Sequence, residues 1–509
     1  MKKAILILLA LVMLLSMAAC GGGAKKEDEY RVLNYGGSME PANVDNQQNF
    51  GQVSSVLYYS CADYLWFYDI EGNTHFQLAT GYELADDLSH LTVHLREGVK
   101  FHNGNDFNGD DVIFMLQRAA GNFIHAAHVK CVDFDKTYCP DPYTVEIYFN
   151  EYNASFVDRM STPPFFIWDK EWMEAATDEQ KVTELNGTGP YYLDEWVVGT
   201  KYVLKRNENY WGEKPLYDEI NIYFIPEPAT RMMEFELGNL DICEVTQPST
   251  VTKLASGGYD NSTVFVVPTQ TLVGFKFQMN GPTADFWPKE VREAIAHAID
   301  TEAICAALNE GSDTYKPATS TLSDRNWAYL DTGAYEYNPE LSRKLLKDAG
   351  IDHFEFNSGM YTSNPLQVSA AEMIQEYLNQ VGITMTIETL NASEWSSRNR
   401  EFTNPGVLVS TSIGIDPWDM FNLWLPPSTS IMRAPEENAE LIALLGEANT
   451  YPDQATRAEK FKQIQQIIHD EIYFIPVYES AVNYAVKKDL ALELNMFDFM
   501  GSFRPLLYK

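Results

Sequence analysis

The feature that most constrains the fold of this chain is the alternation of short strand-like and helix-like segments along its length. Leu91, Val93 and Leu95 alternate with polar residues, a period of two that predicts a half-buried strand. Residues 288–298 carry apolar side chains at helical spacing, and residues 383–387 return to the period of two. This alternation is typical of an α/β protein, and 509 residues exceed what one hydrophobic core usually serves. We therefore expect an α/β fold with two or more lobes.

The N-terminus has the layout of a secretion signal. Two lysines precede an apolar stretch at residues 4–15, and small residues then lead to Cys20. The apolar stretch is too short to span a membrane core of ~30 Å. Cys20 is followed by three glycines, which resembles a bacterial lipoprotein processing site. We predict a signal peptide at residues 1–19, lipidation of Cys20 and a tether at residues 20–29. An ordinary cleaved signal, with Cys20 incidental, is the alternative.

The charge of the chain restricts its partners. Its formal net charge is −35, and nucleic-acid phosphates need Lys and Arg to displace their counterions. We therefore predict no nucleic-acid partner. The acidity suits a cationic ligand, but a solvated, self-repelling surface explains it as well. No segment after Cys20 offers ~18 uninterrupted apolar residues, so we expect the rest of the chain to be soluble.

Five cysteines follow Cys20, and two of them are close in sequence. Outside a cell, Cys131 and Cys139 could form a disulfide that closes a short loop. The odd number leaves at least one thiol free. His125, His128 and Cys131 recur every three residues and could instead hold a soft metal. Spacing without a fourth ligand is a weak metal signal, so we favour the disulfide and predict no metal site.

Common signatures of catalysis are missing from the sequence. It contains no G-x-S-x-G elbow, no H-E-x-x-H pair and no phosphate loop ending in Gly-Lys-Ser or Gly-Lys-Thr. We therefore predict that the protein is not an enzyme and needs no cofactor. Without a nucleotide site it cannot drive transport by itself.

Four stretches of the chain resemble one known family. They are residues 95–104, 187–191, 291–300 and 337–350. They occur in the order, and roughly at the spacing, seen in the bacterial extracellular solute-binding proteins of family 5. These proteins bind oligopeptides, dipeptides, nickel and related solutes and serve ATP-driven (ABC) importers. The resemblance spans about residues 31–509.

The resemblance implies a two-lobed α/β fold of the periplasmic-binding-protein (Venus flytrap) type. Two strands join the lobes, and the first lobe carries an inserted subdomain. Mapped onto this chain, the first lobe takes residues 30–66, 188–272 and 484–509, the inserted subdomain takes residues 67–187, and the second lobe takes residues 273–483.

The resemblance also suggests which residues touch the ligand. The candidates are Asn46, Gln47, Gln48 and Asn49 in the first lobe, Trp395, Arg398, Asp416, Trp418 and Asp419 in the second lobe, and Tyr478, Glu479 and Asn483 near the return crossing. A solvated loop at residues 46–49 and a core position for Trp395 are the alternatives. Peptide-binding members have an acidic residue about three positions before Asp416. This chain has Ile413 there, so Asp416 or Asp419 would have to take its role.

The function we predict is that of an ABC-transporter substrate-binding lipoprotein. It would capture a small solute, a short peptide first of all, in a cleft that closes, and deliver it to permease and ATPase subunits. An oligosaccharide or metal chelate as the ligand, or a surface chaperone or enzyme that reuses the fold, are the alternatives. We expect a monomer anchored to the outer face of the cytoplasmic membrane.

Overall fold

The computed structural model describes residues 30–48, 52–122, 125–361, 364–412, 414–490, 496–498 and 502–504. Within them, the largest sheet has nine strands in the order β16-β12-β17-β11-β1-β10-β9-β8, with β13 paired to β17. These strands are β1 (Val32–Gly37), β8 (Tyr191–Val197), β9 (Lys201–Arg206), β10 (Glu219–Phe224), β11 (Ile242–Val245), β12 (Ser262–Phe277), β13 (Tyr315–Pro317), β16 (Gly406–Ser412) and β17 (Phe474–Lys487). Strand β1 runs parallel to β10 and β11, and the other pairs in this sheet are antiparallel.

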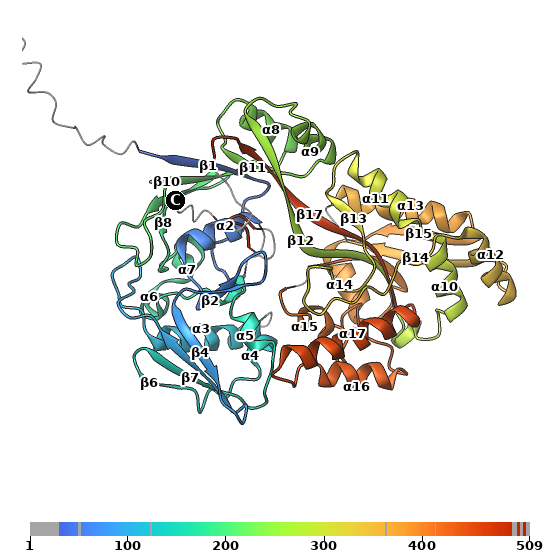
Figure 1. The fold of residues 1–509 in the computed structure, drawn as a ribbon, viewed down its shortest axis with the longest axis horizontal. Helices are drawn as coiled ribbons and strands as arrows, with labels where there is room; N and C mark the ends of the chain where they lie inside the picture. Colours follow the sequence, from blue (N-terminus) through green and yellow to red (C-terminus); the bar gives the residue numbers. More distant parts are fainter. Residues whose placement is uncertain are drawn as a thin grey trace, which may run out of the picture.

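Two long strands of this sheet join the two halves of the molecule (Figure 1). Strands β12 and β17 pair in antiparallel register from Ser262 opposite Lys487 to Lys276 opposite Phe474. The register shifts between Pro268 and Thr271, so the pair is irregular where it passes from one half to the other. We call β12 and β17 the crossing strands.

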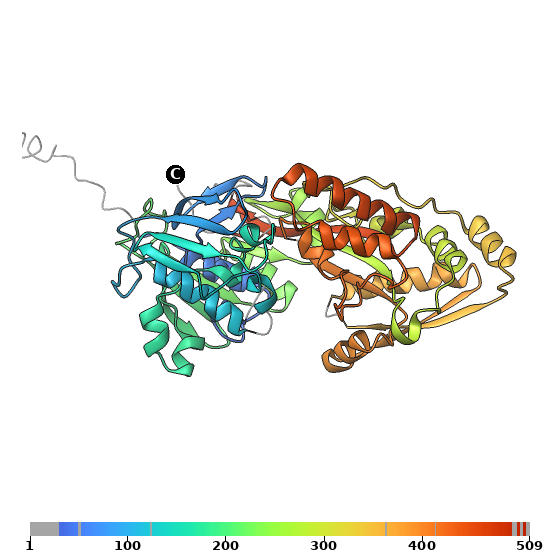
Figure 2. The same ribbon diagram turned by 90° about the horizontal axis from the view of Figure 1, so that it is seen from below.

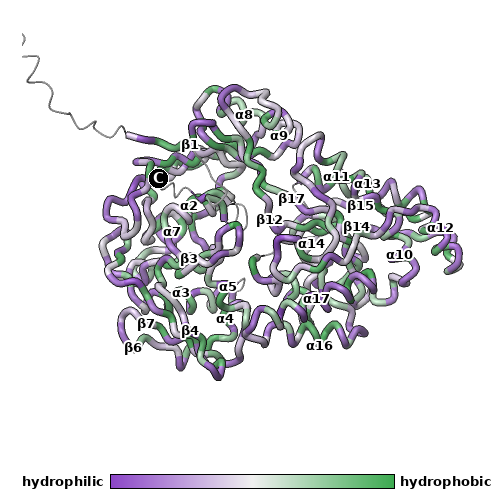
Figure 3. Tube along the Cα trace, in the orientation of Figure 1, coloured by the Kyte–Doolittle hydropathy of each residue, from purple (hydrophilic) through white to green (hydrophobic). Residues whose placement is uncertain are grey.

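The first lobe is built on β1, β8–β11 and the adjoining ends of the crossing strands. Its helices are α2 (Gln52–Cys61), α8 (Pro228–Glu236) and α9 (Pro248–Ala255). Its main hydrophobic cluster includes Leu33, Tyr35, Tyr202 and Ile222, all fully buried. Figure 3 shows hydrophobic residues along the strands of the main sheet, whereas the outer helix α12 (Pro339–Asp348) is mostly hydrophilic.

An insertion between α2 and β8 forms a four-stranded sheet, in the order β4-β5-β7-β6, and a two-stranded hairpin. Its elements are β2 (Trp66–Tyr68), β3 (Thr74–Phe76), β4 (Ala79–Leu84), β5 (His90–Leu95), α3 (Gly109–Gly121), α4 (Ala126–Val129), β6 (Tyr138–Asp141), β7 (Thr144–Tyr148), α5 (Phe156–Arg159), η1 (Pro163–Phe165), α6 (Lys170–Ala175) and α7 (Asp178–Thr183). The strand predicted from Leu91, Val93 and Leu95 is confirmed, because these three side chains are buried in β5. Asn108 caps α3 and forms a capping box with Asp111.

The second lobe packs helices around the remaining strands. Its elements beyond the main sheet are η2 (Gly281–Thr283), α10 (Lys289–Ala298), α11 (Thr301–Asn309), α12, β14 (Phe354–Met360), α13 (Pro365–Asn379), β15 (Ile383–Thr389), α14 (Ala392–Arg400), α15 (Trp418–Phe421), α16 (Ala439–Glu447) and α17 (Gln454–Asp470). The parallel pair of β14 and β15 flanks α13, which makes a β/α unit. The helix predicted at 288–298 and the strand predicted at 383–387 are confirmed. No helix among the described residues is both long and apolar enough to cross a membrane.

The predicted disulfide between Cys131 and Cys139 is wrong, because both residues are free thiols in the structure. Cys131 is buried in the hydrophobic cluster of the insertion. The Cys139 sulfur packs against Gly109, where a Cβ atom would lie only 2.5 Å from it. Each sulfur therefore has its own packing site. The weaker metal hypothesis gains no support either, because among the described residues the ligand atoms of His125, His128 and Cys131 do not gather at one point.

Candidate functional site

The insertion and the second lobe touch through side chains from segments far apart in the sequence. Figure 1 shows α5 of the insertion facing α15 and α17, and Figure 2 shows the two halves side by side from below. The Arg159 guanidinium forms an ion pair with the Asp419 carboxylate at 2.5 Å. Asn449 receives a hydrogen bond from the Ser155 backbone N–H at 3.1 Å and donates one to the Asn153 side chain at 2.6 Å. We call these five residues the interlobe contact.

Carboxylates gather behind this contact. Asp416 is buried and pairs with Arg457 of α17 at 2.7 Å. Asp158 receives a hydrogen bond from the Tyr68 hydroxyl. Burial, and then the neighbouring Asp416 carboxylate, raise the pKa of Asp158 well above its ordinary value. Burial also raises the pKa of Asp419 to about 6, against the opposing effect of Arg159. The region therefore holds more carboxyl groups than its arginines neutralise.

A small cavity of about 50 Å³ lies between the two halves. It is lined by Tyr59, Phe67, Tyr68, Ser161, Thr162, Pro163, Gly414, Ile415 and Asp498. A cavity of this size has room for a few water molecules or one small polar group. The lining combines the first lobe, the insertion, the second lobe and the C-terminal segment, so the cavity exists only while the halves are together.

The C-terminal segment forms one wall of this cavity. The Asp498 carboxylate accepts a hydrogen bond from the Tyr59 hydroxyl, and Asp498 pairs with Asp69 in an isolated antiparallel bridge. Arg504 is buried, and its guanidinium carbon lies 3.4 Å from the centre of the Phe67 ring. These contacts hold the segment against α2 and β2.

The candidates of the first lobe lie close to this region but are engaged by the protein. Asn46 is fully buried, receives a hydrogen bond from Trp168 Nε1 at 2.7 Å and donates one to the Pro163 carbonyl oxygen at 2.8 Å. Gln47 donates to the Pro164 carbonyl oxygen at 3.3 Å, and Gln48 donates to Asp45 at 2.7 Å. Asn49 lies outside the described residues. Through Pro163, Asn46 supports the cavity from behind.

The second-lobe candidates divide into two groups. Asp416 and Asp419 lie at the interlobe contact, and half-buried Trp418 packs against the second-lobe core beside them. Trp395 packs against the same core from α14. The Arg398 guanidinium makes a bidentate pair with Glu388, at 2.7 Å and 2.8 Å. The structure brings the two aspartates together with the insertion, whereas Arg398 already holds a carboxylate of the protein.

The candidates near the return crossing lie on β17 and are buried. The Tyr478 ring meets Tyr315 edge-on, with ring centres 5.3 Å apart. Glu479 accepts a hydrogen bond from Ser323 at 2.6 Å, and burial raises its pKa. Asn483 donates to the Thr314 hydroxyl at 3.1 Å. Their contacts tie β17 to the 312–323 segment of the second lobe.

Sequence reasoning missed one residue of the second lobe and the residues that approach from the insertion and the C-terminal segment. They are Tyr68, Asp158, Arg159, Asn449 and Asp498. Arg159 lies 260 positions from its partner Asp419 in the numbering of the chain. Acidic and aromatic residues are frequent throughout this chain, so no local pattern distinguished these five.

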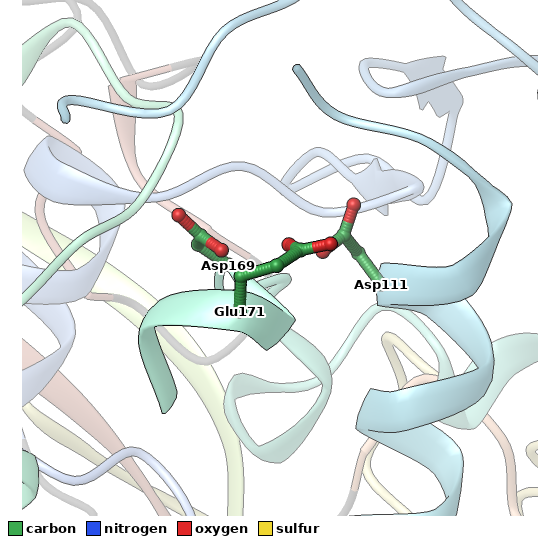
Figure 4. A group of neighbouring side chains, drawn as sticks. All are labelled: Asp111, Asp169 and Glu171. Carbon is green, nitrogen blue, oxygen red and sulfur yellow. The ribbon is translucent and has the colours of Figure 1, made fainter. Parts of the chain in front are cut away.

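Two other features of the described residues look like sites but are explained by the fold. Figure 4 shows Asp111, Asp169 and Glu171, whose carboxylates approach one another. Asp111 closes the capping box of α3 and Asp169 caps α6, so both have structural partners. A surface hollow of about 740 Å³ lies beside α8, but it is lined by the first lobe alone. Neither feature joins the two lobes.

Comparisons with known proteins agree with this architecture. The family model of the bacterial extracellular solute-binding proteins, family 5, matches residues 73–430. The heme-binding protein A of Haemophilus influenzae is 27% identical over 435 residues, which cover 79% of this chain and 78% of that protein. The dipeptide-binding protein of Escherichia coli is 25% identical over 452 residues, covering 81% and 82%. The crystal structure of NikA from Brucella suis in complex with Fe(III)-EDTA superposes with a TM-score of 0.82 at 23% identity, covering 93% of this chain and 98% of that one.

Proposed function

The chain belongs to the bacterial extracellular solute-binding proteins of family 5, and from this premise we propose that it captures a short peptide and delivers it to an ABC importer. The peptide is proposed because relatives named for dipeptides and for di- and tripeptides align over 81% of this chain. A heme or a metal chelate is the second candidate, because the Haemophilus relative is named for heme and the Brucella structure is a complex with Fe(III)-EDTA. A binding protein of this kind performs no chemistry on its ligand.

One observation carries the proposal: a cavity whose walls come from both halves of a molecule joined by two strands. A ligand can shift the balance between open and closed forms only if it binds them with different affinity. A solute held by Tyr68 on one side and Ile415 on the other meets this condition. Because the remaining space is about 50 Å³, a whole peptide requires the lobes to stand further apart than they do here.

The two crossing strands would act as the hinge. A hinge of this type absorbs changes in φ and ψ over a few residues while each lobe moves as a rigid body. The register shift between Pro268 and Thr271 is the proposed position. The hydrophobic clusters agree only in part with the proposed division into residues 30–66, 188–272 and 484–509, residues 67–187, and residues 273–483, because the main first-lobe cluster also contains Phe166, Trp168 and Met173 of the insertion.

We further propose that the protein is anchored outside the cell through Cys20, which lies outside the described residues. Two or three acyl chains would hold it stably on a membrane, since each buried CH₂ contributes about 0.8 kcal/mol. Replacing Cys20 by Ser is expected to release the protein from membrane fractions into the medium. Retention of the Cys20→Ser protein on membranes would argue against the anchor.

The capture mechanism is tested by solution scattering together with thermal unfolding. A cognate solute is expected to raise the melting temperature by mass action and to reduce the radius of gyration. Di- and tripeptide mixtures, Fe(III)-EDTA, heme and maltotriose are the solutes to compare. Binding without compaction refutes closure, and the absence of binding by every solute refutes the proposed function.

A further inference from the structure

We propose that residues 323–326 of the second lobe couple the hinge in the crossing strands to the closing of the insertion against the second lobe. We call these residues the coupling segment. Arg325 and Asn326 are its positioning residues, because they bind the two moving parts from neighbouring positions in the chain. This inference rests on the proposed function, in which the lobes close over a solute, and names the residues that make the hinge and the cleft move together.

At the hinge, a side chain of the coupling segment holds the irregular part of β12. The register shift leaves Thr269 and Gln270 without positions opposite them on β17. The Thr269 hydroxyl donates to the Ser480 carbonyl oxygen at 2.8 Å and so replaces a backbone group. The Gln270 side chain is fully buried, and its carbonyl oxygen accepts a hydrogen bond from the Asn326 side chain at 3.0 Å. The bulge therefore depends on a contact with the second lobe.

Asn326 binds the wall of the interlobe cavity with the same amide nitrogen. Its Nδ2 also donates to the Ile415 carbonyl oxygen at 3.3 Å, and its Oδ1 accepts from the Ala328 backbone N–H at 3.1 Å. Ile415 lines the cavity. Because one planar amide group makes all three bonds, a shift of Ile415 changes the geometry of the bond to Gln270.

Arg325, the preceding residue, reaches the insertion. Its guanidinium donates to the Ile70 carbonyl oxygen, in the turn between β2 and β3. A Cβ atom on Gly72 of the same turn would lie 3.8 Å from the Ile415 side chain, so this turn also approaches the cavity wall. The bond from Arg325 joins the two halves through residues that do not belong to the interlobe contact. It exists only while the halves are together.

The coupling segment is fixed to the second lobe. Ser323 is fully buried, and its hydroxyl donates to Glu479 of β17 at 2.6 Å. The Asn326 backbone N–H donates to the Ser323 carbonyl oxygen at 2.9 Å, which closes a turn. Lys316 pairs with Asp324 at 2.7 Å and with Glu479 at 3.3 Å. A segment held in this way moves with the second lobe as one body, so a displacement at the hinge changes the contact with the insertion, and the reverse.

The test follows the ratio of open to closed forms by solution scattering of the full-length protein without solute. Arg325→Met removes a charged donor that has its partner only in the closed form. This change is expected to raise the ratio of open to closed forms about tenfold, seen as a larger radius of gyration. Arg325→Lys keeps a charged donor and is expected to show a smaller increase.

Gln270→Met separates coupling from folding. The Gln270 Nε2 atom is buried and has no hydrogen-bond partner among the described residues. A methionine of similar length removes this unpaired donor, so the urea midpoint should stay the same or rise. It also frees the bulge from Asn326, so the ratio of open to closed forms is expected to rise about fivefold. Should Arg325→Met lower the urea midpoint, Gln270→Met decides the matter.

Two residues with the same chemistry inside the second lobe provide matched controls. Arg343 donates to the Gln380 carbonyl oxygen at 3.1 Å, and Gln375 donates to the Met385 carbonyl oxygen at 2.6 Å. Arg343→Met and Gln375→Met are expected to leave the radius of gyration unchanged, because neither bond joins the two halves.

The double variant of Arg325→Met and Gln270→Met measures the coupling itself. Independent sites would raise the ratio of open to closed forms about fiftyfold together. Coupled sites are expected to give about tenfold, because either change alone already releases the segment. A rise near fiftyfold overturns the proposal. An unchanged radius of gyration in either single variant overturns it as well.

Solutes test the proposed function separately in the same samples. A tripeptide mixture, Fe(III)-EDTA, heme and maltotriose are added to the wild-type protein. If none of them binds or compacts it, the proposed function fails, while scattering without solute still decides whether the hinge and the insertion are coupled. If one of them compacts the wild-type protein and the double variant shows independent sites, capture by closure stands and the coupling segment is overturned.

Discussion

The two halves of this molecule are joined in two different ways. The crossing strands connect them through continuous chain and through backbone hydrogen bonds over most of their length. The interlobe contact connects them through polar groups, among them the Arg159–Asp419 pair and Asn449. The first connection has buried apolar side chains such as Val267 and Leu272, whereas the second is polar and charged.

This difference separates stability from closure. Backbone pairing between β12 and β17 does not depend on whether the lobes are apart, so damage to it costs folding free energy. The interlobe contact can exist only when the lobes are together, so damage to it changes the balance between open and closed forms. Polar contacts suit this task because water can replace them when they open.

The largest effect is expected at the crossing strands. A Cβ atom on Gly274 of β12 would lie 2.1 Å from the Phe474 ring and 2.8 Å from the Ile475 carbonyl oxygen. Gly274→Val should therefore reduce the free energy of unfolding by about 3 kcal/mol or more, because the core has no room for the side chain. Urea unfolding measures this loss.

The control for Gly274→Val is Gly446→Ala. Gly446 lies in α16 and has no atom within 4 Å of the position that a Cβ would take. Alanine at this helical position should raise the free energy of unfolding by roughly 1 kcal/mol. A Gly274→Val protein with an unchanged urea midpoint would show that the crossing strands tolerate repacking, and the comparison drawn above would lose its basis.

The next largest effect is expected at the ion pair of the interlobe contact. Arg159→Met removes the guanidinium but keeps much of the side-chain length, and it leaves the Asp419 carboxylate without its partner when the lobes close. Truncating one side of a buried charge pair costs about 2 kcal/mol or more. Scattering should show a larger radius of gyration for Arg159→Met without added solute, while the urea midpoint changes little.

Lys136→Met serves as the control for Arg159→Met. Lys136 forms an exposed ion pair with Asp133 inside the insertion, far from the second lobe in sequence and contacts. An exposed pair of this kind contributes little. A radius of gyration that stays the same in Arg159→Met would mean that the ion pair does not hold the lobes together.

Acid should favour closure through Asp419. Its pKa is about 6 in the closed structure, and an exposed aspartate titrates near 3.8. Closing therefore takes up a proton. The equilibrium constant for closing increases as the pH falls from about 6 to about 4, by at most about tenfold per pH unit. Above pH 6 this increase is absent, and below pH 4 the equilibrium constant no longer changes with Asp419.

The groups that face the Asp419 carboxyl set this window. They are Arg159, Asp416, Arg457 and the Gly414 backbone N–H. Scattering across the pH range should show compaction on acidification. Asp419→Asn should remove the part of this compaction that depends on the Asp419 carboxyl. Asp158 shifts in the same direction, so its Asn variant measures the remainder. Expansion of the wild-type protein on acidification to pH 4 would contradict the sign.

The sequence predicted the scaffold better than the contacts between its parts. The strand at Leu91, the helix at residues 288–298 and the strand at residues 383–387 follow local rules of periodicity, and the structure contains all three. Local rules work here because each depends on neighbours within a few residues.

The candidate site was harder to predict, because its residues meet only through the tertiary fold. Asp416 and Asp419 were found through the family pattern, but Arg159 and Asp158 lie in a four-residue helix with no distinctive sequence. The Cys131–Cys139 spacing permitted a disulfide, but the sequence does not reveal that each sulfur packs separately. Charge pairing across 260 positions depends on how the lobes fold together.

The smallest expected effect sharpens the same comparison at Asn449. Its side chain contacts Ser155 and Asn153 of the insertion, and it also accepts a hydrogen bond from the Arg457 guanidinium at 3.1 Å. Asn449→Ala removes neutral hydrogen bonds that water can replace on opening, so closure should weaken by about 1 kcal/mol, less than in Arg159→Met.

Asn438→Ala is a poor control because Asn438 caps α16, whereas exposed Asn239, bonded to Glu234 near the far end of the first lobe, provides a suitable one. Combining Asn449→Ala with Arg159→Met completes a double-mutant cycle. A coupling energy near zero would mean that the two contacts open independently, and a larger coupling would mean that the lobes separate as one cooperative surface.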